Sequence, residues 1–213
     1  MMNLPIKVAI LASERQDLFP PNCTAPVELL WTDSLDRFLE CSASIFIDLD
    51  FDGSEFRKKQ LVQLQPAIVV VNSVSWVCAD LPAGFIRLNG WPGFTHPEIL
   101  ELAAESDQLP ALLSDFAVSC GKTCLKVPDT VGMVRPRILA MIINEAWLAL
   151  EEEISSATEI DTAMKMGTNY PLGPFEWTDR IGKKEVLTLL QQLAKQNPSF
   201  KPSSLLERQT SEL

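Results

Sequence analysis

The first half of the chain carries short apolar, β-branched runs that recur between turn-rich or amphipathic segments. The runs cover residues 6–12, 27–31, 44–49, 67–72 and 85–88. Because they lack the polar and apolar alternation of half-exposed strands, they predict strands buried on both faces. Amphipathic segments at residues 34–41, opened by Asp33 and Ser34, and at residues 55–64 predict helices between them. This order favours an α/β domain with a mainly parallel sheet.

Three further segments complete this domain. Residues 97–104 are amphipathic, and we group them with the helices. Residues 110–119 predict a helix that Gly121 ends, and residues 123–127 predict a strand.

Residues 137–153 change the spacing of apolar residues from strand-like to helical. One face of the expected helix carries Ile138, Met141, Ile142, Leu148 and Ala149, with Glu145 as its one polar member. Shorter helices are predicted at residues 156–166 and 174–181, ended by Gly167 and Gly182, and at residues 183–195. We therefore expect an α/β domain at residues 1–128, an all-α domain at residues 129–206 and a loosely held tail at residues 207–213.

The charge of the chain limits its partners. Eighteen basic and 28 acidic residues give a net charge of −10, which opposes binding to phosphate backbones and anionic membrane surfaces. The sequence has no apolar run near the roughly 20 residues that cross a bilayer. We expect neither a nucleic-acid partner nor a membrane partner.

The cysteines indicate the redox environment. Their number is odd, and they are scattered: Cys23, Cys41, Cys78, Cys120 and Cys124. The N-terminus lacks the basic region and long apolar stretch of a secretory signal, so we expect thiols in a reducing, cytoplasmic environment. No second cysteine pair joins the one at residues 120–124, and the chain has one histidine, so we expect no metal.

Four motifs in the second half have the order and spacing of a known family. They are Asp-Thr-Val-Gly at 129–132, Asn-Glu-Ala at 144–146, Ile-Asp-Thr-Ala-Met-Lys-Met-Gly at 160–167, and Tyr-Pro-Leu-Gly-Pro-Phe-Glu at 170–176. This series resembles the helical domain of the 3-hydroxyacyl-CoA dehydrogenases, including the 3-hydroxybutyryl-CoA enzymes. The resemblance implies a Rossmann domain that binds NAD, a helical domain that forms most of a homodimer interface, and an acyl-CoA thioester held between the domains.

The segment after the first expected strand departs from a dinucleotide-binding pattern. Such a site needs glycines that let the backbone approach the pyrophosphate. Residues 13–21 contain no glycine. They do contain two carboxylates, Glu14 and Asp17, and two prolines. We expect no cofactor; NAD would be the cofactor if this interpretation is wrong. Asp33 either binds the ribose hydroxyls of a dinucleotide or caps the helix that follows it.

The resemblance places the family's catalytic pair on one altered and one kept residue. The histidine that accepts the substrate proton corresponds to Asn89, and the glutamate that orients it corresponds to Glu101. An asparagine side chain cannot take up a proton at neutral pH. Glu101 is either part of the site or a solvent-facing or capping residue. The one histidine, His96, lies in a turn, where we interpret it as a helix-start or surface residue.

Two further family positions are altered as well. A serine corresponds to Val74, although Ser73 and Ser75 beside it are candidates for substrate binding. An active-site asparagine corresponds to Pro136, which has neither a side-chain amide nor a backbone N–H.

These substitutions lead to three hypotheses. In the first, the chain is a catalytically degenerate relative that keeps the homodimer framework and a site for an acyl-CoA ligand. In the second, it is a short active enzyme, either an NAD-dependent dehydrogenase or a catalyst of another acyl-CoA reaction that uses Glu101 with Asn89, Ser73 or Ser75. In the third, it is a purely structural dimeric subunit. The sequence leaves open whether the chain is an enzyme, its acyl-chain length and its pathway.

Overall fold

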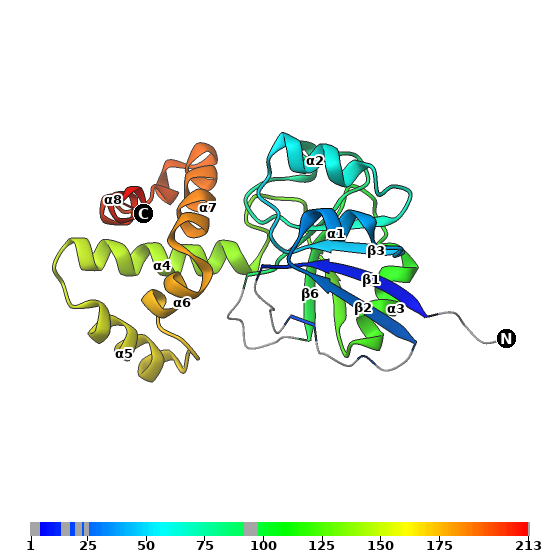
Figure 1. Cartoon of the computed structure of the whole chain (residues 1–213). Helices are drawn as coiled ribbons and strands as arrows, with labels where there is room; N and C mark the ends of the chain where they lie inside the picture. Colours follow the sequence, from blue (N-terminus) through cyan, green and yellow to red (C-terminus); the bar gives the residue numbers. More distant parts are fainter. Residues whose placement is uncertain (1–4, 14–17, 20–22, 24–25, 92–97, 213) are drawn as a thin grey trace. The chain divides into compact units, whose positions relative to one another are not determined.

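The computed structural model describes residues 5–13, 18–19, 23, 26–91 and 98–212 (Figure 1). In chain order the elements are β1 Ile6–Leu11, β2 Val27–Thr32, α1 Leu35–Glu40, β3 Ile45–Asp48, α2 Glu55–Val62, β4 Ile68–Asn72, η1 Cys78–Asp80, β5 Ile86–Leu88, β6 Ile99–Ala103, α3 Ala111–Ser119, β7 Thr123–Lys126, α4 Arg135–Glu151, α5 Ala157–Thr168, α6 Pro174–Ile181, α7 Lys183–Gln196, η2 Pro198–Phe200 and α8 Ser204–Ser211. The chain forms two compact units, residues 1–90 with 96–133, and residues 91–95 with 134–213.

The first unit is built on one seven-stranded sheet with the order β2-β1-β3-β4-β5-β6-β7. The neighbouring pairs β2–β1, β1–β3, β3–β4, β4–β5 and β6–β7 are parallel, whereas β5 and β6 are antiparallel. The predicted fold class, a mainly parallel α/β domain followed by an all-α domain, is confirmed. The first unit ends at Met133, whereas the sequence places the end of the α/β domain at residue 128.

Alternate strand residues supply two apolar layers, one on each face of the sheet. In β1, Val8 and Ile10 join the layer that α3 covers through Phe116. Ala9 and Leu11 join the opposite layer, which includes Phe38 of α1 and Leu61 of α2. Because side chains alternate along a strand, a strand that is buried on both faces favours apolar residues at most of its positions. This preference explains the continuous apolar runs of the sequence.

Residues 97–104 correct one expectation, because residues 99–103 form the strand β6 rather than a helix. Pairing with β5 on one side and β7 on the other buries β6, and Leu100 and Leu102 enter the core. The segment is too short for an amphipathic helix to be distinguished from a buried strand by its apolar spacing.

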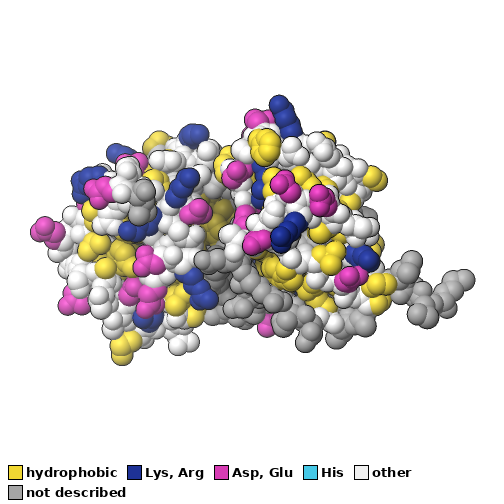
Figure 2. All heavy atoms as spheres, viewed as in Figure 1, with side chains coloured by type: hydrophobic (Ala, Val, Ile, Leu, Met, Phe, Trp, Pro, Cys, Tyr) yellow, Lys and Arg dark blue, Asp and Glu magenta, His cyan; other side chains and the backbone are white. Residues whose placement is uncertain are grey.

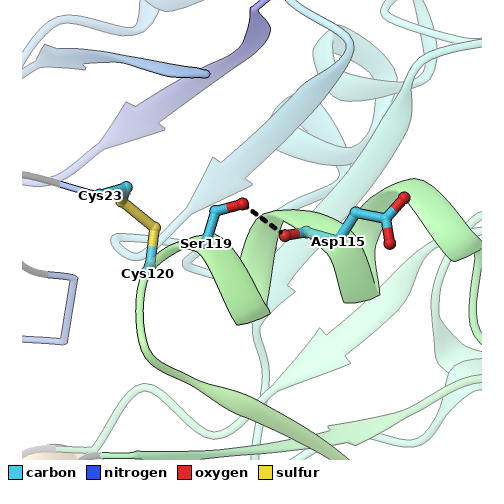
Figure 3. Close-up of a disulfide and its surroundings, with 4 residues drawn as sticks. All are labelled: Cys23, Asp115, Ser119 and Cys120. Atoms are coloured by element: carbon cyan, nitrogen blue, oxygen red, sulfur yellow. Dashed lines mark hydrogen bonds between the residues drawn. A yellow bond between two sulfur atoms is a disulfide. The ribbon is translucent and has the colours of Figure 1, made fainter. Parts of the chain in front are cut away.

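A disulfide corrects the expectation that all cysteines are thiols. Cys23 is bonded to Cys120 at the end of α3, with an S–S distance of 2.06 Å (Figure 3). The two cysteines are 97 positions apart, so no local pattern in the sequence indicates the pairing. Cys41, Cys78 and Cys124 are thiols. Within the described ranges, no cluster of three or more His, Cys, Asp or Glu residues could hold a metal ion.

The second unit is organised around α4. The buried side of α4 includes Leu139, Ile143 and Trp147, and the Trp147 indole donates to Thr178 Oγ1 of α6 at 3.2 Å. The carboxylate of Asp161 on α5 accepts from the backbone N–H groups of Phe175 and Glu176, which caps the start of α6. Helix α5 includes Gly167, the expected stop, runs to Thr168, and is ended by Asn169 in a left-handed conformation.

The C-terminal segment is a helix and not the loosely held tail expected at residues 207–213. Ser203 caps α8, its hydroxyl bonds Glu151 of α4 at 2.7 Å, and Leu206 is fully buried. Lys183 of α7 also donates to Gln209 at 2.9 Å. None of the helices described is both long enough and apolar enough to cross a bilayer.

Candidate functional site

Polar side chains follow the strands of the parallel sheet at their carboxyl ends. Ser13 follows β1, Asp50 follows β3, Ser73 and Ser75 follow β4, and Asn89 follows β5. Parallel strands have their carboxyl ends at one edge of the sheet, and this edge is where α/β proteins bind ligands. The candidate site is therefore this carboxyl edge.

Asn89 and Glu101, the two residues predicted at the catalytic positions, form a buried pair. Their side chains have 5% and 1% exposure, and Asn89 Nδ2 donates to Glu101 Oε2 at 3.2 Å. The antiparallel pairing of β5 with β6 sets this geometry, since the Asn89 N–H also donates to the Glu101 carbonyl at 3.0 Å. The solvent-facing interpretation of Glu101 is wrong, because the strand buries both of its faces.

Ser73 and Ser75, the predicted substrate-binding serines, are also buried, with 0% and 5% exposure. The backbone N–H of Ser73 donates to the Leu88 carbonyl at 3.2 Å. Among the described residues, Ser73 Oγ has no hydrogen-bond partner. A buried hydroxyl without a partner costs about 1–3 kcal/mol, and a ligand oxygen could remove that cost.

Arg87 holds the loop that carries these serines, and the sequence did not reveal its role. Its fully buried guanidinium donates to the carbonyls of Ser73 at 2.9 Å and Val74 at 3.3 Å. It also forms an ion pair with Asp129, whose carboxylate accepts the Cys78 N–H at 2.9 Å. The one available signal was a charged residue inside the apolar run at 85–88.

The Arg87 ion pair perturbs two neighbouring groups. Burial opposes ionisation of Asp129, but hydrogen bonds from Arg87 and from the Cys78 backbone prevail and hold the pKa of Asp129 below its ordinary value. Burial, and then the adjacent Asp129 carboxylate, raise the pKa of the Cys78 thiol to about 12. Cys78 is thus a protonated thiol at neutral pH and a poor nucleophile.

Asn72 joins the ends of three neighbouring strands. Its Nδ2 donates to the Leu49 carbonyl at 3.1 Å, and its Oδ1 accepts the Gly90 N–H at 2.9 Å. A Cβ atom on Gly90 would lie 2.7 Å from the Asn72 side chain, so any larger residue after Asn89 would have to displace the Asn72 amide. This contact fixes the backbone beside the Asn89–Glu101 pair.

The other end of the edge is formed by Ser13, Asp48, Asp50 and Arg57. The Ser13 N–H donates to the Asp50 carboxylate, and the Ser13 hydroxyl lies 3.4 Å from Asp50 Oδ1. Arg57 binds the fully buried Asp48 through two bonds, of 2.6 and 3.0 Å. Burial opposes the charge of Arg57, but its bonds to Asp48 prevail and raise its pKa.

Two predicted positions take no part in the contacts given above, and a third is not described by the structure. Asp33 is exposed and follows β2, which pairs with β1. Ser34 is the N-cap residue of α1, and its side chain makes no capping hydrogen bond. Pro136 occupies the first turn of α4 in the second unit. His96 lies outside the described residues.

Comparisons with known proteins agree with the sequence resemblance. The family model for the C-terminal domain of 3-hydroxyacyl-CoA dehydrogenase matches residues 132–212. The chain is 43% identical over 90 residues to the 3-hydroxyadipyl-CoA dehydrogenase of Escherichia coli, covering 41% of this chain and 19% of that protein. It is 32% identical over 136 residues to the mitochondrial hydroxyacyl-coenzyme A dehydrogenase of Sus scrofa, covering 62% of this chain and 43% of that protein.

A solved structure extends the similarity to both units. The (S)-3-hydroxybutyryl-CoA dehydrogenase of Ralstonia eutropha aligns with a TM-score of 0.68 and 26% identity, over 86% of this chain and 70% of that one. The matches to the two curated relatives each span less than half of the relative's length.

Proposed function

We propose that the chain is a catalytically degenerate member of the 3-hydroxyacyl-CoA dehydrogenase family, the family whose C-terminal domain it matches, and that it binds an acyl-CoA thioester without oxidising it. The observation that carries this proposal is the buried Asn89–Glu101 pair. General-base catalysis needs a group that can accept the substrate proton, and Asn89 stands where the resemblance places that base. The two side chains are buried and hydrogen-bonded, but the Asn89 amide cannot accept the substrate proton at this position.

One buried polar group, the hydroxyl of Ser73, supports binding of a thioester. The Ser73 hydroxyl has no partner among the described residues, and a hydroxyl can donate to a carbonyl or thioester oxygen. Arg87 and Asn72 fix the backbone on both sides of it. A rigid, incompletely satisfied polar group is better suited to binding a ligand than to stabilising the free protein.

A second apolar face on α4 supports a homodimer through the helical unit. Ile138 is 56% exposed, and Met141, Ile142, Leu148 and Ala149 on the same face are only partly buried. Ile154 and Met166, after α4 and on α5, are 69% and 82% exposed. Figure 2 shows hydrophobic side chains reaching the surface of this unit between charged ones. A helix that is apolar on two sides needs a partner for each, and a second copy would cover the outer side.

The proposal is tested by two assays on the purified protein. We expect no NADH from 3-hydroxybutyryl-CoA and NAD, and we expect calorimetric binding of acetoacetyl-CoA with a dissociation constant near 1 μM, which corresponds to about −8 kcal/mol. Ser73→Ala should weaken that binding, whereas Ser44→Ala, at an exposed serine before the amino end of β3, should leave it unchanged.

Each assay can contradict one part of the proposal. NADH formation that is lost in Glu101→Gln would support the short active enzyme. Absence of thioester binding in a protein that sediments as a dimer would favour the purely structural subunit.

A further inference from the structure

The backbone N–H that follows β1 is bound to a carboxylate of the same chain. Ser13 lies immediately beyond the strand, and its N–H donates to Asp50 Oδ2. The Ser13 hydroxyl lies 3.4 Å from the other oxygen, Oδ1. Asp50 follows β3, and β3 is the direct neighbour of β1 in the sheet. The contact therefore joins the ends of two adjacent parallel strands.

In a dinucleotide-binding α/β fold, this end of the first strand faces the pyrophosphate. Backbone N–H groups at the first strand-to-helix turn donate to the phosphate oxygens, at the point where the strand order reverses. In this chain β1 is the strand whose neighbours on its two sides are β2 and β3, so the order reverses here. Asp50 thus presents two anionic oxygens at the place where such a fold receives an anion.

The position of Asp50 is set by a second, more deeply buried carboxylate. The Asp50 N–H donates to Asp48 Oδ1 at 3.1 Å, and Asp48 is fully buried. Arg57 in the first turn of α2 binds both oxygens of Asp48. The nearby Arg57 guanidinium is therefore committed to Asp48 instead of being available to neutralise a phosphate.

We infer that Asp50 is an intramolecular substitute for the cofactor's pyrophosphate and excludes a dinucleotide from this edge of the sheet. The residues at the end of β1 do not fit NAD, because the donor is occupied and a second anion would face a carboxylate at hydrogen-bond distance. This inference rests on the proposed function and deepens it, since it gives a physical reason why a protein of this kind would bind a thioester but not NAD. Its test does not depend on whether the thioester binds.

Inorganic pyrophosphate is the probe that tests the inference. Asp50→Ala removes the competing carboxylate, and we expect the variant to bind pyrophosphate at least about tenfold more tightly than the wild type, as measured by calorimetry. Asp52→Ala is the matched control, because it removes one exposed carboxylate that bonds Ser54 rather than Ser13. We expect this control to stay within about twofold of the wild type. Equal affinities of the two variants would overturn the inference.

A second measurement does not rely on a gain of binding. In the amide NMR spectrum, Asp50→Asn should shift the Ser13 resonance, while Asp52→Asn should leave it in place. A Ser13 resonance that is unmoved by Asp50→Asn, or one that moves when NADH is added to the wild type, would contradict the inference. An acetoacetyl-CoA titration of the same samples separates this outcome from failure of the proposed function, because thioester binding should be the same in all of them.

Discussion

The two ends of the carboxyl edge differ in how their polar groups are satisfied. Beside β1 and β3, the chain supplies its own anion: the Asp50 carboxylate binds the Ser13 N–H, and Arg57 is committed to Asp48. Beside β4 and β5, the Ser73 hydroxyl is buried with no partner among the described residues. The first end is satisfied by groups of the chain itself, whereas the second keeps one hydroxyl without a hydrogen bond. We call these the closed end and the open end.

The largest expected effect tests what holds the open end in place. Arg87→Leu should lower the free energy of unfolding by about 3–5 kcal/mol, because it removes the cation that pairs with Asp129 and the donor to three backbone carbonyls, those of Ser73, Val74 and Thr130. Chemical denaturation measures this loss. The control Lys7→Ala removes one partner of an exposed ion pair and should cost less than about 1 kcal/mol. A similar cost for both variants would mean that Arg87 does not organise this loop.

The next effect concerns the disulfide of the first unit. Cys23→Ser should destabilise the protein by about 2–4 kcal/mol, because the Cys23–Cys120 bond closes a long loop in the unfolded chain. The matched variant Cys41→Ser alters a thiol and should change stability by less than about 0.5 kcal/mol. Thiol titration of the denatured protein gives an independent check, since five free thiols would contradict the bond.

Disulfide bonds are typical of oxidising compartments or of redox-sensitive proteins, so a cytoplasmic location stays a prediction.

A smaller effect separates stability from binding at the open end. Ser73→Ala should stabilise the free protein by up to about 1 kcal/mol, because it removes a buried hydroxyl that has no partner. The same change should weaken acetoacetyl-CoA binding by about tenfold, since one hydrogen bond is worth roughly 1 kcal/mol. Loss of stability without loss of affinity would show that the hydroxyl serves the fold instead of a ligand.

The smallest effect is a change in acid sensitivity. The folded-state pKa of Asp129 lies below its unfolded value, so its contribution to stability is present at neutral pH and is lost as pH falls through the folded pKa. Unfolding free energies measured between neutral pH and about pH 3 should therefore fall less steeply for Asp129→Asn than for the wild type. Identical slopes would contradict the assigned ion pair with Arg87.

The parts of the fold that follow from local spacing could be predicted from the sequence. The buried strands and the long helix α4 were indicated by apolar runs and by helical periodicity, respectively. The strand β6 was missed because its five residues around Glu101 are too few to distinguish the apolar spacing of a helix from that of a strand. The C-terminal helix was missed because its stability comes from Ser203 and Leu206 packing against distant helices.

The site was only partly predictable for the same reason. Asn89 and Glu101 were paired through the resemblance, and the register of β5 with β6 brings them together. The expectation that no dinucleotide binds rested on the lack of glycine and on acids at positions 14 and 17, which lie outside the described residues, and it stays a prediction. The carboxylate that binds the Ser13 N–H is instead Asp50, and Arg87 acts through Asp129, 42 positions away. Contacts of this range depend on the folded sheet and leave no local pattern.

The most direct test of a closed and an open end is to titrate the wild-type protein separately with NADH and with acetoacetyl-CoA. Binding is measured by calorimetry and by quenching of the fluorescence of its five tryptophans. We expect saturable micromolar binding of the thioester and no saturable binding of NADH. Micromolar NADH binding would contradict the account, because it would require a dinucleotide to occupy the edge where Asp50 binds Ser13.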